Sequence, residues 1–544
     1  MKYLIYTVYT LLTLSKLVYG QVTERPRPTK WDSLVMGGRF IDRFSPMVKG
    51  HRQTGLWGAV GVQKRYIDNG IEDKERSYWG GNIVYDSVGQ LYNLYVCGWD
   101  EKWPKGHHQW PRSTVYHAVS KQMHGPYSIK DTIGPGHNPE VFRLKNGTYV
   151  LYVIDKRYTA SSLNGPWKQD TFHFDKRDRK IIEGLSNLTF AKRGDGSYLM
   201  VCRGGGVWFS NDGLSPFYQV SDRRVYPDVE GEFEDPVVWR DHIQYHLIVN
   251  DWLGRIAFYL RSKDGVNWIT DPGEAYTNQI ALHQDGTKEA WYKFERMKVL
   301  QDHHGRAIQA NFAVIDVEKD FDKGNDMHSS KNIAIPLNPG LLISMLDKKM
   351  PTDKTKEIRV KIMAEPGFNP LEEVDVKSLR FGASDQVNYG GGCSALDAEA
   401  DGKDLIVRFD AKGHGITETE FAPKLIGRSK KGKLLYGYTR APWLVYRESI
   451  LSARKPILKD NKRLVVEVTN FGEVRSNKAK VSLYRIRNGR KELVASSQVV
   501  PLNPFDQVML DLVPKGPPRL VINDNYSIEI EANNNVKSTF DFRW

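Results

Sequence analysis

Hydrophobic residues over the first 345 positions occur in short runs of strand length, separated by polar turns rich in Gly, Asp and Asn. The clearest example is GEFEDPVVWRDHIQYHLIVNDW at 231–252, where an acidic cluster leads through Pro236 into the apolar run VVW. A polar turn then precedes a second apolar run. This pattern, with Pro at the first strand position, predicts two paired β-strands whose acidic end faces a cavity.

The same pattern recurs along the chain. Its five strand starts lie roughly fifty to sixty residues apart, at Gly80, Asn138, Asn187, Asp235 and Glu295. A second echo, a strand followed by a turn and an aromatic residue, lies between them at 118–127, 160–167, 209–217 and 261–268. Two interleaved repeats of this period predict a five-bladed β-propeller. The segment VMGGRFIDRFSPM (35–47) is predicted to be the strand that closes the ring.

Beyond residue 345 the pattern changes to short alternating strands such as KEIRVKIMAEPG and LIVRFD. Near the C-terminus, TNFG followed by alternating Val and Leu is typical of immunoglobulin-like sandwiches. We therefore predict an all-β fold: a five-bladed β-propeller followed by one or two β-sandwich domains. The predicted domains are a propeller at 21–345, a β-sandwich at 346–440 and an Ig-like β-sandwich at 441–544.

The first twenty residues, MKYLIYTVYTLLTLSKLVYG, carry an early Lys2 and an apolar run that Lys16 interrupts. This composition predicts a signal peptide at 1–20 and hence a secreted or periplasmic protein, without a membrane span. The cysteines Cys97, Cys202 and Cys393 are too few for a disulfide framework, and we predict buried free thiols.

Charge narrows the choice of partner. Lys and Arg total 78 against 65 Asp and Glu, a net charge of +13, yet the basic residues are dispersed and no nucleic-acid motif is present. A basic secreted protein suits an anionic polysaccharide, although a solvated surface without any partner explains the charge equally well. The loop 98–113 holds several aromatic residues for sugar contacts, and its adjacent His107 and His108 lack the further partners of a metal site.

In a propeller the first strand of every blade lines the central channel, so the strand starts converge on one funnel. They bring together several carboxylates, among them Glu140, Glu234, Asp235 and Glu295. Because side chains alternate along a strand, only one of Glu234 and Asp235 is expected to face the axis. Paired carboxylates suit glycosidic bond cleavage, with one acid and one carboxylate that activates water or attacks the sugar. Turn capping, pairing with Arg296 or a structural ion are the alternatives.

Five blades, repeated hairpins such as SSLNGPW and a strand that opens with Asp235-Pro236 resemble glycoside hydrolase families 43 and 117. The resemblance covers about residues 35–345. It implies an inverting reaction with a carboxylate base, a second Asp that tunes a pKa and a Glu acid, which is a His in family 117. It also implies a central Ca2+ ion. By motif, Asp235 matches the base or tuning Asp, and Glu295 is the candidate acid.

The chain departs from the family pattern at Gly80-Gly81 and Asn138-Pro139, where family 43 has Asp-Pro. Asn cannot act as a base, so Asp42 or Glu140 would have to supply one, and His137 is a candidate acid. The catalytic candidates are thus Asp235, Glu295, Glu140, His137 and Asp42. The predicted substrate contacts are Trp79, Asn82, Asn187, Arg203, Arg255, Arg296, His108 and Trp110. No metal ligands are assigned.

The favoured function is hydrolysis of glycosidic bonds in an anionic plant or algal polysaccharide or its oligosaccharides. A propeller-type polysaccharide lyase is one alternative, with His137 as base and Arg203 and Arg296 neutralising a uronate. A non-catalytic carbohydrate-binding propeller is the other. Lyase products absorb in the ultraviolet and hydrolase products do not, whereas a binding module would show no turnover.

Overall fold

The computed structural model describes residues 24–52, 58–181, 184–459, 463–514, 521, 523–532 and 535–544. The predicted signal peptide at 1–20 lies outside the described residues. Among the residues that are described, no helix has the length and apolar character needed to span a bilayer.

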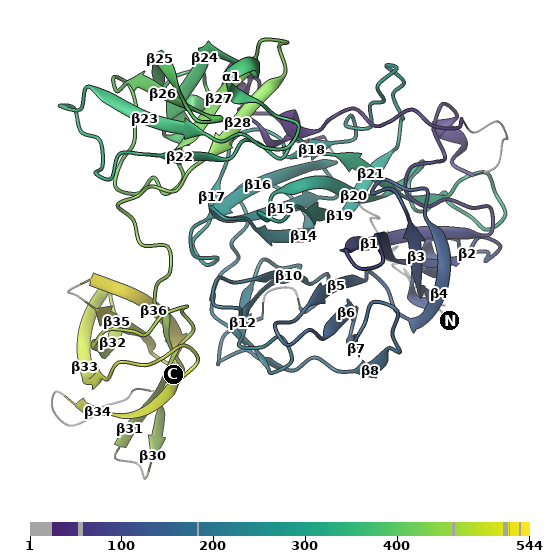
Figure 1. Cartoon of the computed structure of the whole chain (residues 1–544). Helices are drawn as coiled ribbons and strands as arrows, with labels where there is room; N and C mark the ends of the chain where they lie inside the picture. The colour runs from purple at the N-terminus through teal and green to yellow at the C-terminus, as the bar shows by residue number, and fades with distance from the viewer. Residues whose placement is uncertain are drawn as a thin grey trace, which may run out of the picture.

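Five antiparallel sheets follow one another along residues 76–336 and form the blades of a propeller (Figure 1). Blade 1 contains β1 (Arg76–Asp86), β2 (Leu91–Asp100), β3 (Thr114–Ser120) and β4 (Ser128–Pro135). Blade 2 contains β5 (Glu140–Arg143), β6 (Tyr149–Val153), β7 (Lys156–Ala160) and β8 (Lys168–Asp170). Blade 3 contains β10 (Thr189–Lys192), β11 (Tyr198–Val201), β12 (Val207–Ser210) and β13 (Phe217–Gln219), with β9 (Phe174–Asp175) parallel to β13.

Blade 4 contains β14 (Phe233–Arg240), β15 (Tyr245–Asp251), β16 (Ile256–Ser262) and β17 (Ile269–Thr270), with β18 (Tyr276–Thr277) also paired to β16. Blade 5 contains β19 (Lys293–Gln301), β20 (Ala307–Ile315) and β21 (Ser330–Pro336). The ring closes because β1 packs against both β19 of blade 5 and β5 of blade 2. The predicted five-bladed propeller is therefore confirmed.

The middle strands of the blades are buried on both faces. Every residue of β15 and β16 is buried, which leaves no polar alternation along YHLIVND or IAFYLRS. A strand covered by sheets on both sides reads as a continuous apolar run. This packing explains why the repeat was visible in the sequence as short hydrophobic runs.

The predicted closing strand at 35–47 is wrong. The segment instead holds the 3-10 helix η2 (Phe40–Arg43), followed by single bridges from Phe44 to Leu337 and from Met47 to His283. Asp42 Oδ2 accepts hydrogen bonds from the amides of Gly37 and Arg39 at 2.9 and 3.2 Å. Local capping of this kind competes with strand pairing. The other short helices of the propeller are η1 (Thr29–Ser33), η3 (Val60–Val62) and η4 (Gly106–Arg112).

Each blade has a left-handed residue at the equivalent place, either within its inner strand or two residues before it. The φ angles are 54°, 54°, 49°, 54° and 53° at Gly80, Asn138, Asn187, Asp235 and Arg296. The register of β1, β14 and β19 shifts at this residue, as in a β-bulge. The equivalent residue in blade 5 is therefore Arg296, one position after the expected Glu295.

The bulge sorts the inner-strand side chains into three layers. We call the left-handed residues other than Gly80 the axial ring, which comprises Asn138, Asn187, Asp235 and Arg296. The residues just before the bulge form the rim layer, which comprises Trp79, His137, Ser186, Glu234 and Glu295. The residues two positions after it form the lower layer, which comprises Asn82, Glu140, Thr189, Val237 and Lys298.

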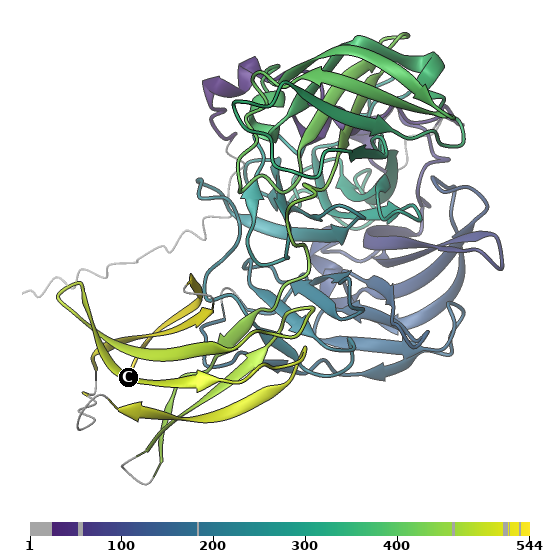
Figure 2. The ribbon, with the colours of Figure 1, turned by 60° about the vertical axis from the view of Figure 1, so that its left-hand side comes forward.

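Two further β units follow the propeller, each curled around its own hydrophobic core (Figure 2). The first is a seven-stranded sheet with two short helices, α1 (Pro370–Glu373) and α2 (Ser384–Val387). Its strands are β22 (Ile343–Met345), β23 (Glu357–Ile362), β24 (Val374–Gly382), β25 (Cys393–Asp401), β26 (Asp404–Asp410), β27 (Lys424–Ser429) and β28 (Leu434–Tyr438). The predicted β-sandwich region is thus confirmed as all-β.

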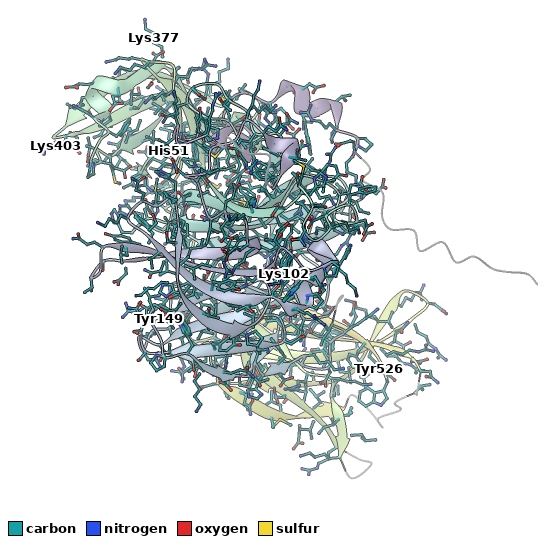
Figure 3. All side chains as sticks on the ribbon, turned by 90° about the vertical axis from the view of Figure 1, so that its right-hand side faces the viewer. His51, Lys102, Tyr149, Lys377, Lys403 and Tyr526 are labelled. Atoms are coloured by element: carbon teal, nitrogen blue, oxygen red, sulfur yellow. The ribbon has the colours of Figure 1, made fainter. Side chains whose placement is uncertain are left out.

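The second unit is an eight-stranded sheet, in which the short strand β30 pairs only with β31. Its strands are β29 (Leu451–Ala453), β30 (Ile457–Lys459), β31 (Arg463–Asn470), β32 (Ala479–Arg487), β33 (Arg490–Val499), β34 (Gln507–Pro514), β35 (Asn525–Ala532) and β36 (Asn535–Arg543). In Figure 3, Lys403 of the first unit and Tyr526 of the second lie at opposite ends of the molecule, with the propeller between them.

Both units contact the propeller through buried polar groups. Lys424 Nζ donates to Gly37 O at 2.8 Å in the first unit, and Arg177 Nη1 lies 2.7 Å from Glu467 Oε1 in the second. The cysteines Cys97, Cys202 and Cys393 are buried free thiols, as predicted.

Candidate functional site

The axial ring is a chain of hydrogen bonds that runs from blade to blade. Asn138 Nδ2 donates to Asn187 Oδ1 at 3.0 Å, and Asn187 Nδ2 donates to Asp235 Oδ1 at 2.9 Å. Asp235 in turn accepts from the backbone amide of Arg296 at 3.1 Å and from its Nη1 at 2.8 Å. All four side chains are buried. The structure therefore brings together three of the predicted site residues, Asp235, Arg296 and Asn187. They form a buried polar cluster in which most of the side-chain hydrogen bonds are made to one another.

The lower layer connects neighbouring blades. Glu140 Oε1 accepts from the amide of Phe190 at 3.0 Å, and its other oxygen is bonded to Lys298 Nζ. Asn82 Oδ1 likewise accepts from the amide of Val141 at 2.8 Å. Glu140 and Asn82 thus hold blades together, and both line a cavity of about 490 Å³ that lies beyond the axial ring from the rim layer.

Glu234 of the rim layer is a carboxyl group near the axis whose pKa is strongly raised. Its Oε1 accepts from Asn187 Nδ2 at 2.9 Å and lies 3.5 Å from Arg203 Nη1, while 21% of the side chain is exposed. Burial, followed by the charge of Asp235, raises the pKa of Glu234 to about 7. A carboxyl group with this pKa is protonated at slightly acidic pH and can donate its proton.

Glu295 lies in the equivalent position of the next blade and is held differently. Its Oε2 accepts from Lys319 Nζ at 2.6 Å, and its side chain is 3% exposed. Within the described part of the chain its Oε1 is buried without a hydrogen-bond partner, and Lys293 Nζ lies 3.9 Å from it. One oxygen of Glu295 is therefore anchored, whereas the other keeps an unused hydrogen-bond acceptor site.

Lys319 links the rim residues. Although burial lowers its pKa, the charges of Glu295 and Glu234 raise it by more, so that the pKa of Lys319 lies above its ordinary value. The ammonium group also lies 4.9 Å from the ring centroid of Trp79, in a cation–π contact. Trp79 itself is buried and packs edge-on against His107. Trp79 therefore supports Lys319 and presents little of its own surface to a substrate.

His137 is buried at the rim and neutral. Burial, with the charges of Arg296 and Lys319, holds its pKa well below the ordinary value. Its Nδ1 lies 2.9 Å from Ser113 Oγ. A neutral imidazole suits a base or a hydrogen-bond partner and does not suit the acid role that the sequence suggested.

Other predicted contacts lie at the margin of the rim. Trp110 is 38% exposed and its ring centroid is 5.0 Å from that of His137. Arg203 reaches Glu234, and Arg255 stacks on Tyr292 at 4.9 Å. Trp110 and these arginines are well placed to contact a ligand at the rim.

His108 and Asp42 are held in other contacts. His108 Nε2 lies 2.7 Å from Asp320 Oδ1 at the surface. Asp42 pairs with Arg39 at 2.9 Å. It lies in the lead-in segment, where Gly37 packs against Ile426 of the first C-terminal unit. The structure therefore does not bring Asp42 to the axis.

The central Ca2+ ion implied by the family resemblance does not fit the axis. The Arg296 guanidinium already balances the Asp235 carboxylate there, and Lys298 follows in the lower layer. A second cation at this place would be repelled by both side chains. We therefore derive no catalytic step through an axial ion.

No family model matches the chain, and a search of curated proteins finds no match. Among solved structures the chain is similar to a glycoside hydrolase at 12% identity and a TM-score of 0.36, covering 83% of this chain and 97% of that one. It is also similar to the GH43 protein BlXynB from Bacillus licheniformis, at 10% identity and a TM-score of 0.33, covering 88% of this chain and 89% of that one.

A third similar structure is Bacteroides ovatus Xyloglucan PUL GH43B, at 12% identity and a TM-score of 0.33, covering 88% of this chain and 91% of that one. These likenesses span nearly the whole length of the neighbours.

Proposed function

We propose that the protein is a glycoside hydrolase whose catalytic residues are Glu234 and Glu295 at the rim of the propeller. The observation that carries the proposal is that two carboxyl groups on adjacent blades occupy contrasting environments. Burial and Asp235 raise the pKa of Glu234 to about 7, whereas Glu295 is ion-paired with Lys319. Glycosidic bond cleavage requires this division between a protonated acid and a charged carboxylate.

In this mechanism Glu234 protonates the leaving oxygen of the glycosidic bond. Glu295 supplies the second carboxylate through Oε1, which lacks a hydrogen-bond partner among the described residues. The Glu295 carboxylate either activates a water molecule or attacks the anomeric carbon. The first route inverts the configuration of the product and the second retains it, so the product stereochemistry distinguishes them. Asp235 keeps the pKa of Glu234 high and, through Arg296, holds blades 4 and 5 together.

We further propose an anionic substrate, a plant or algal polysaccharide or its oligosaccharides. The rim carries the cations Lys293, Lys319, Arg203 and Arg255, and the whole chain has a net charge of +13. Such a field attracts uronate or sulfate groups. The exposed ring of Trp110 offers an apolar face for a sugar. The predicted signal peptide makes the protein secreted or periplasmic, where it would meet such polymers.

The test is an activity screen on plant and algal polysaccharides that reads reducing ends and ultraviolet absorbance together. Glu234→Gln and Glu295→Gln are the test variants. Glu232→Gln is the matched control, because Glu232 is exposed and lies two residues from Glu234. New reducing ends without absorbance, lost in both test variants and kept in the control, establish the hydrolase. Retained turnover in Glu234→Gln would rule out its acid role.

A lyase is the second candidate, and the neutral His137 favours it. A lyase needs a base near cations that neutralise a uronate, and His137 lies within the field of Lys319 and Arg296. Products that absorb in the ultraviolet would move the assignment to His137. Binding without turnover on every substrate would instead favour the non-catalytic propeller.

A further inference from the structure

Three carboxylates meet outside the rim, between a loop of blade 1 and a loop of blade 5. They are Glu101, Asp322 and Asp326, and one oxygen from each lies within 4.8 Å of the others. Glu101 directly follows β2, whereas the two aspartates lie on the segment that joins β20 to β21. Lys102, the neighbour of Glu101, marks this part of the propeller in Figure 3.

The two loops are closely joined at this point. The amide of Asn325 donates to Glu101 O at 3.0 Å. Gly106 packs so tightly on Asp322 that an added Cβ would lie 2.0 Å from Asp322 O. Backbone contacts therefore hold the three carboxylates near one another, although their negative charges repel.

Asp322 is the unusual member of the cluster. It is 0% exposed, and among the described residues neither of its carboxylate oxygens has a hydrogen-bond partner of normal geometry. A buried carboxylate without a partner is costly, so the cluster calls for a cation or a bound proton.

The other two carboxylates are already oriented. Glu101 Oε2 accepts from Ser77 Oγ at 2.6 Å and from Ser329 Oγ at 3.1 Å. Asp326 accepts from the amides of Lys323 and His328, each at 2.7 Å. Carboxylates that bind metal ions are commonly oriented by hydrogen bonds to neighbouring groups in this way. Asp326 is also partly exposed, which gives an ion a path from solvent.

The spacing and the donor type point to a hard divalent cation. Calcium binds oxygen ligands at roughly 2.3–2.6 Å, so two of its ligands lie at most about 5 Å apart. The 4.8 Å limit on the three oxygens meets this condition. Carboxylate oxygens without a nearby thiolate or imidazole ligand favour calcium or magnesium over zinc or copper. The flexible coordination of calcium tolerates three protein carboxylates completed by water.

We propose that Glu101, Asp322 and Asp326 bind a calcium ion that fastens the blade 5 loop to blade 1. This site lies away from the axis and shares no residue with the axial ring. The same blade 5 loop carries Lys319, whose Nζ pairs with Glu295. The ion is therefore placed to hold Lys319 at the rim. Calcium binding itself is independent of the proposed hydrolase activity.

Two basic groups near the cluster, Lys331 and His328, form ion pairs with carboxylates outside it. Lys331 Nζ lies 4.0 Å from Glu72 Oε1, and burial lowers its pKa although Glu72 and Glu101 raise it. His328 Nδ1 lies 2.9 Å from Asp316 Oδ2. Each of these basic groups has an ion-pair partner outside the cluster, although Lys331 also acts on Glu101, and His328 acts on Asp326 and Asp322.

The experiment removes metal from the full protein with a chelator and then adds Ca2+, Mg2+ or Tb3+. Heat of binding and thermal unfolding are both measured, and Tb3+ emission adds a local readout because Trp99 and Trp103 flank Glu101. We expect Ca2+ at a hundred times its Kd to raise the Tm by roughly 2–5 °C. Asp322→Asn should weaken binding at least tenfold and abolish the shift. Asp320→Asn, on the same loop but outside the cluster, should keep both.

If no cation binds, or if both variants lose binding equally, the proposal is overturned. A bound proton would give another result: Asp322→Asn would raise the Tm of the protein with or without Ca2+, and wild type would show no calcium-dependent shift. That result also overturns the proposal. Glu101→Gln provides a second variant should Asp322→Asn fail to fold, and we expect it too to weaken Ca2+ binding at least tenfold.

Discussion

Asp235 and Arg296 form a buried ion pair at the centre of the propeller, with Arg296 Nη1 2.8 Å from Asp235 Oδ1 and each side chain 2% exposed. Both residues occupy the left-handed bulge of their inner strands, so blade 4 is joined to blade 5 at equivalent positions. Asn187 extends the contact to blade 3. Asp235, which the sequence favoured as catalytic, thus joins neighbouring blades.

We expect Arg296→Met to destabilise the protein by about 3–5 kcal/mol, because it leaves the Asp235 carboxylate buried without its counter-ion. Urea unfolding followed by fluorescence measures the change. Arg255→Met is the control, since Arg255 is partly exposed and stacks on Tyr292 at the margin of the rim. Equal stability of the two variants would contradict a structural role for the axial pair.

The pH dependence of activity should report Glu234. With its pKa raised to about 7, Glu234 is protonated below that pH and ionised above it. As the general acid it is active only when protonated, so we expect kcat/KM to fall about tenfold per pH unit above pH 7. The Glu234→Gln variant, if residually active, should lack this fall in kcat/KM above pH 7. If the fall persists in the variant, another group is responsible for it.

Stability should depend on Glu234 in the same direction. The raised pKa means that the folded state binds this proton more tightly than the unfolded state, whose carboxyl group has the ordinary value of 4.5. The resulting stabilisation is complete below pH 4.5 and is lost as the pH rises to about 7. We expect wild type to lose stability relative to Glu234→Gln across this window, measured as the difference in free energy of unfolding. A constant difference would contradict the raised pKa.

The propeller could be predicted from the sequence because each blade repeats apolar runs of strand length. It misplaced blade 5 by one residue, since the bulge accepts Gly, Asn and Asp readily but here also holds Arg296 at a φ of 53°. A left-handed Arg is not expected from local preference. Only the contacts with Asp235 reveal it.

Lys319 was missed for a different reason. Lys319 lies on the connection after β20 rather than at a strand start, so the repeat carries no signal for it. Glu140 shows the converse limit, because it lies at a strand start but two positions beyond the axial ring, in the lower layer. Strand alignment predicted convergence on the axis, whereas the depth of each side chain along that axis depended on the bulge.

Lys319→Met should impair catalysis by removing the ion partner of Glu295. We expect kcat/KM to fall at least about a hundredfold, as for loss of one charged group in a preorganised site. The alkaline limb of the pH–rate profile should also move to higher pH, because the charge of Lys319 lowers the pKa of Glu234 and its loss removes that effect. Lys319→Arg should retain part of the activity. Lys323→Met, an exposed lysine on the same loop, should match wild type.

Glu140 should prove structural, although the sequence made it a catalytic candidate. Burial lowers the pKa of Lys298, and the charge of Glu140 opposes that change, so the pair depends on both partners. Glu140→Gln leaves Lys298 buried without its carboxylate, and we expect a loss of about 3–5 kcal/mol. Adding Lys298→Met to that variant should restore much of the stability, because no uncompensated charge then remains.

Chemical denaturation of the two single variants and the double variant gives the coupling energy. Activity measured at a temperature where each variant is folded separates a structural from a catalytic role of Glu140. If Glu140 only holds the blades together, its substitution leaves the turnover of the folded protein nearly unchanged. Loss of turnover in the folded Glu140→Gln protein, without a loss of stability, would instead return Glu140 to the catalytic site.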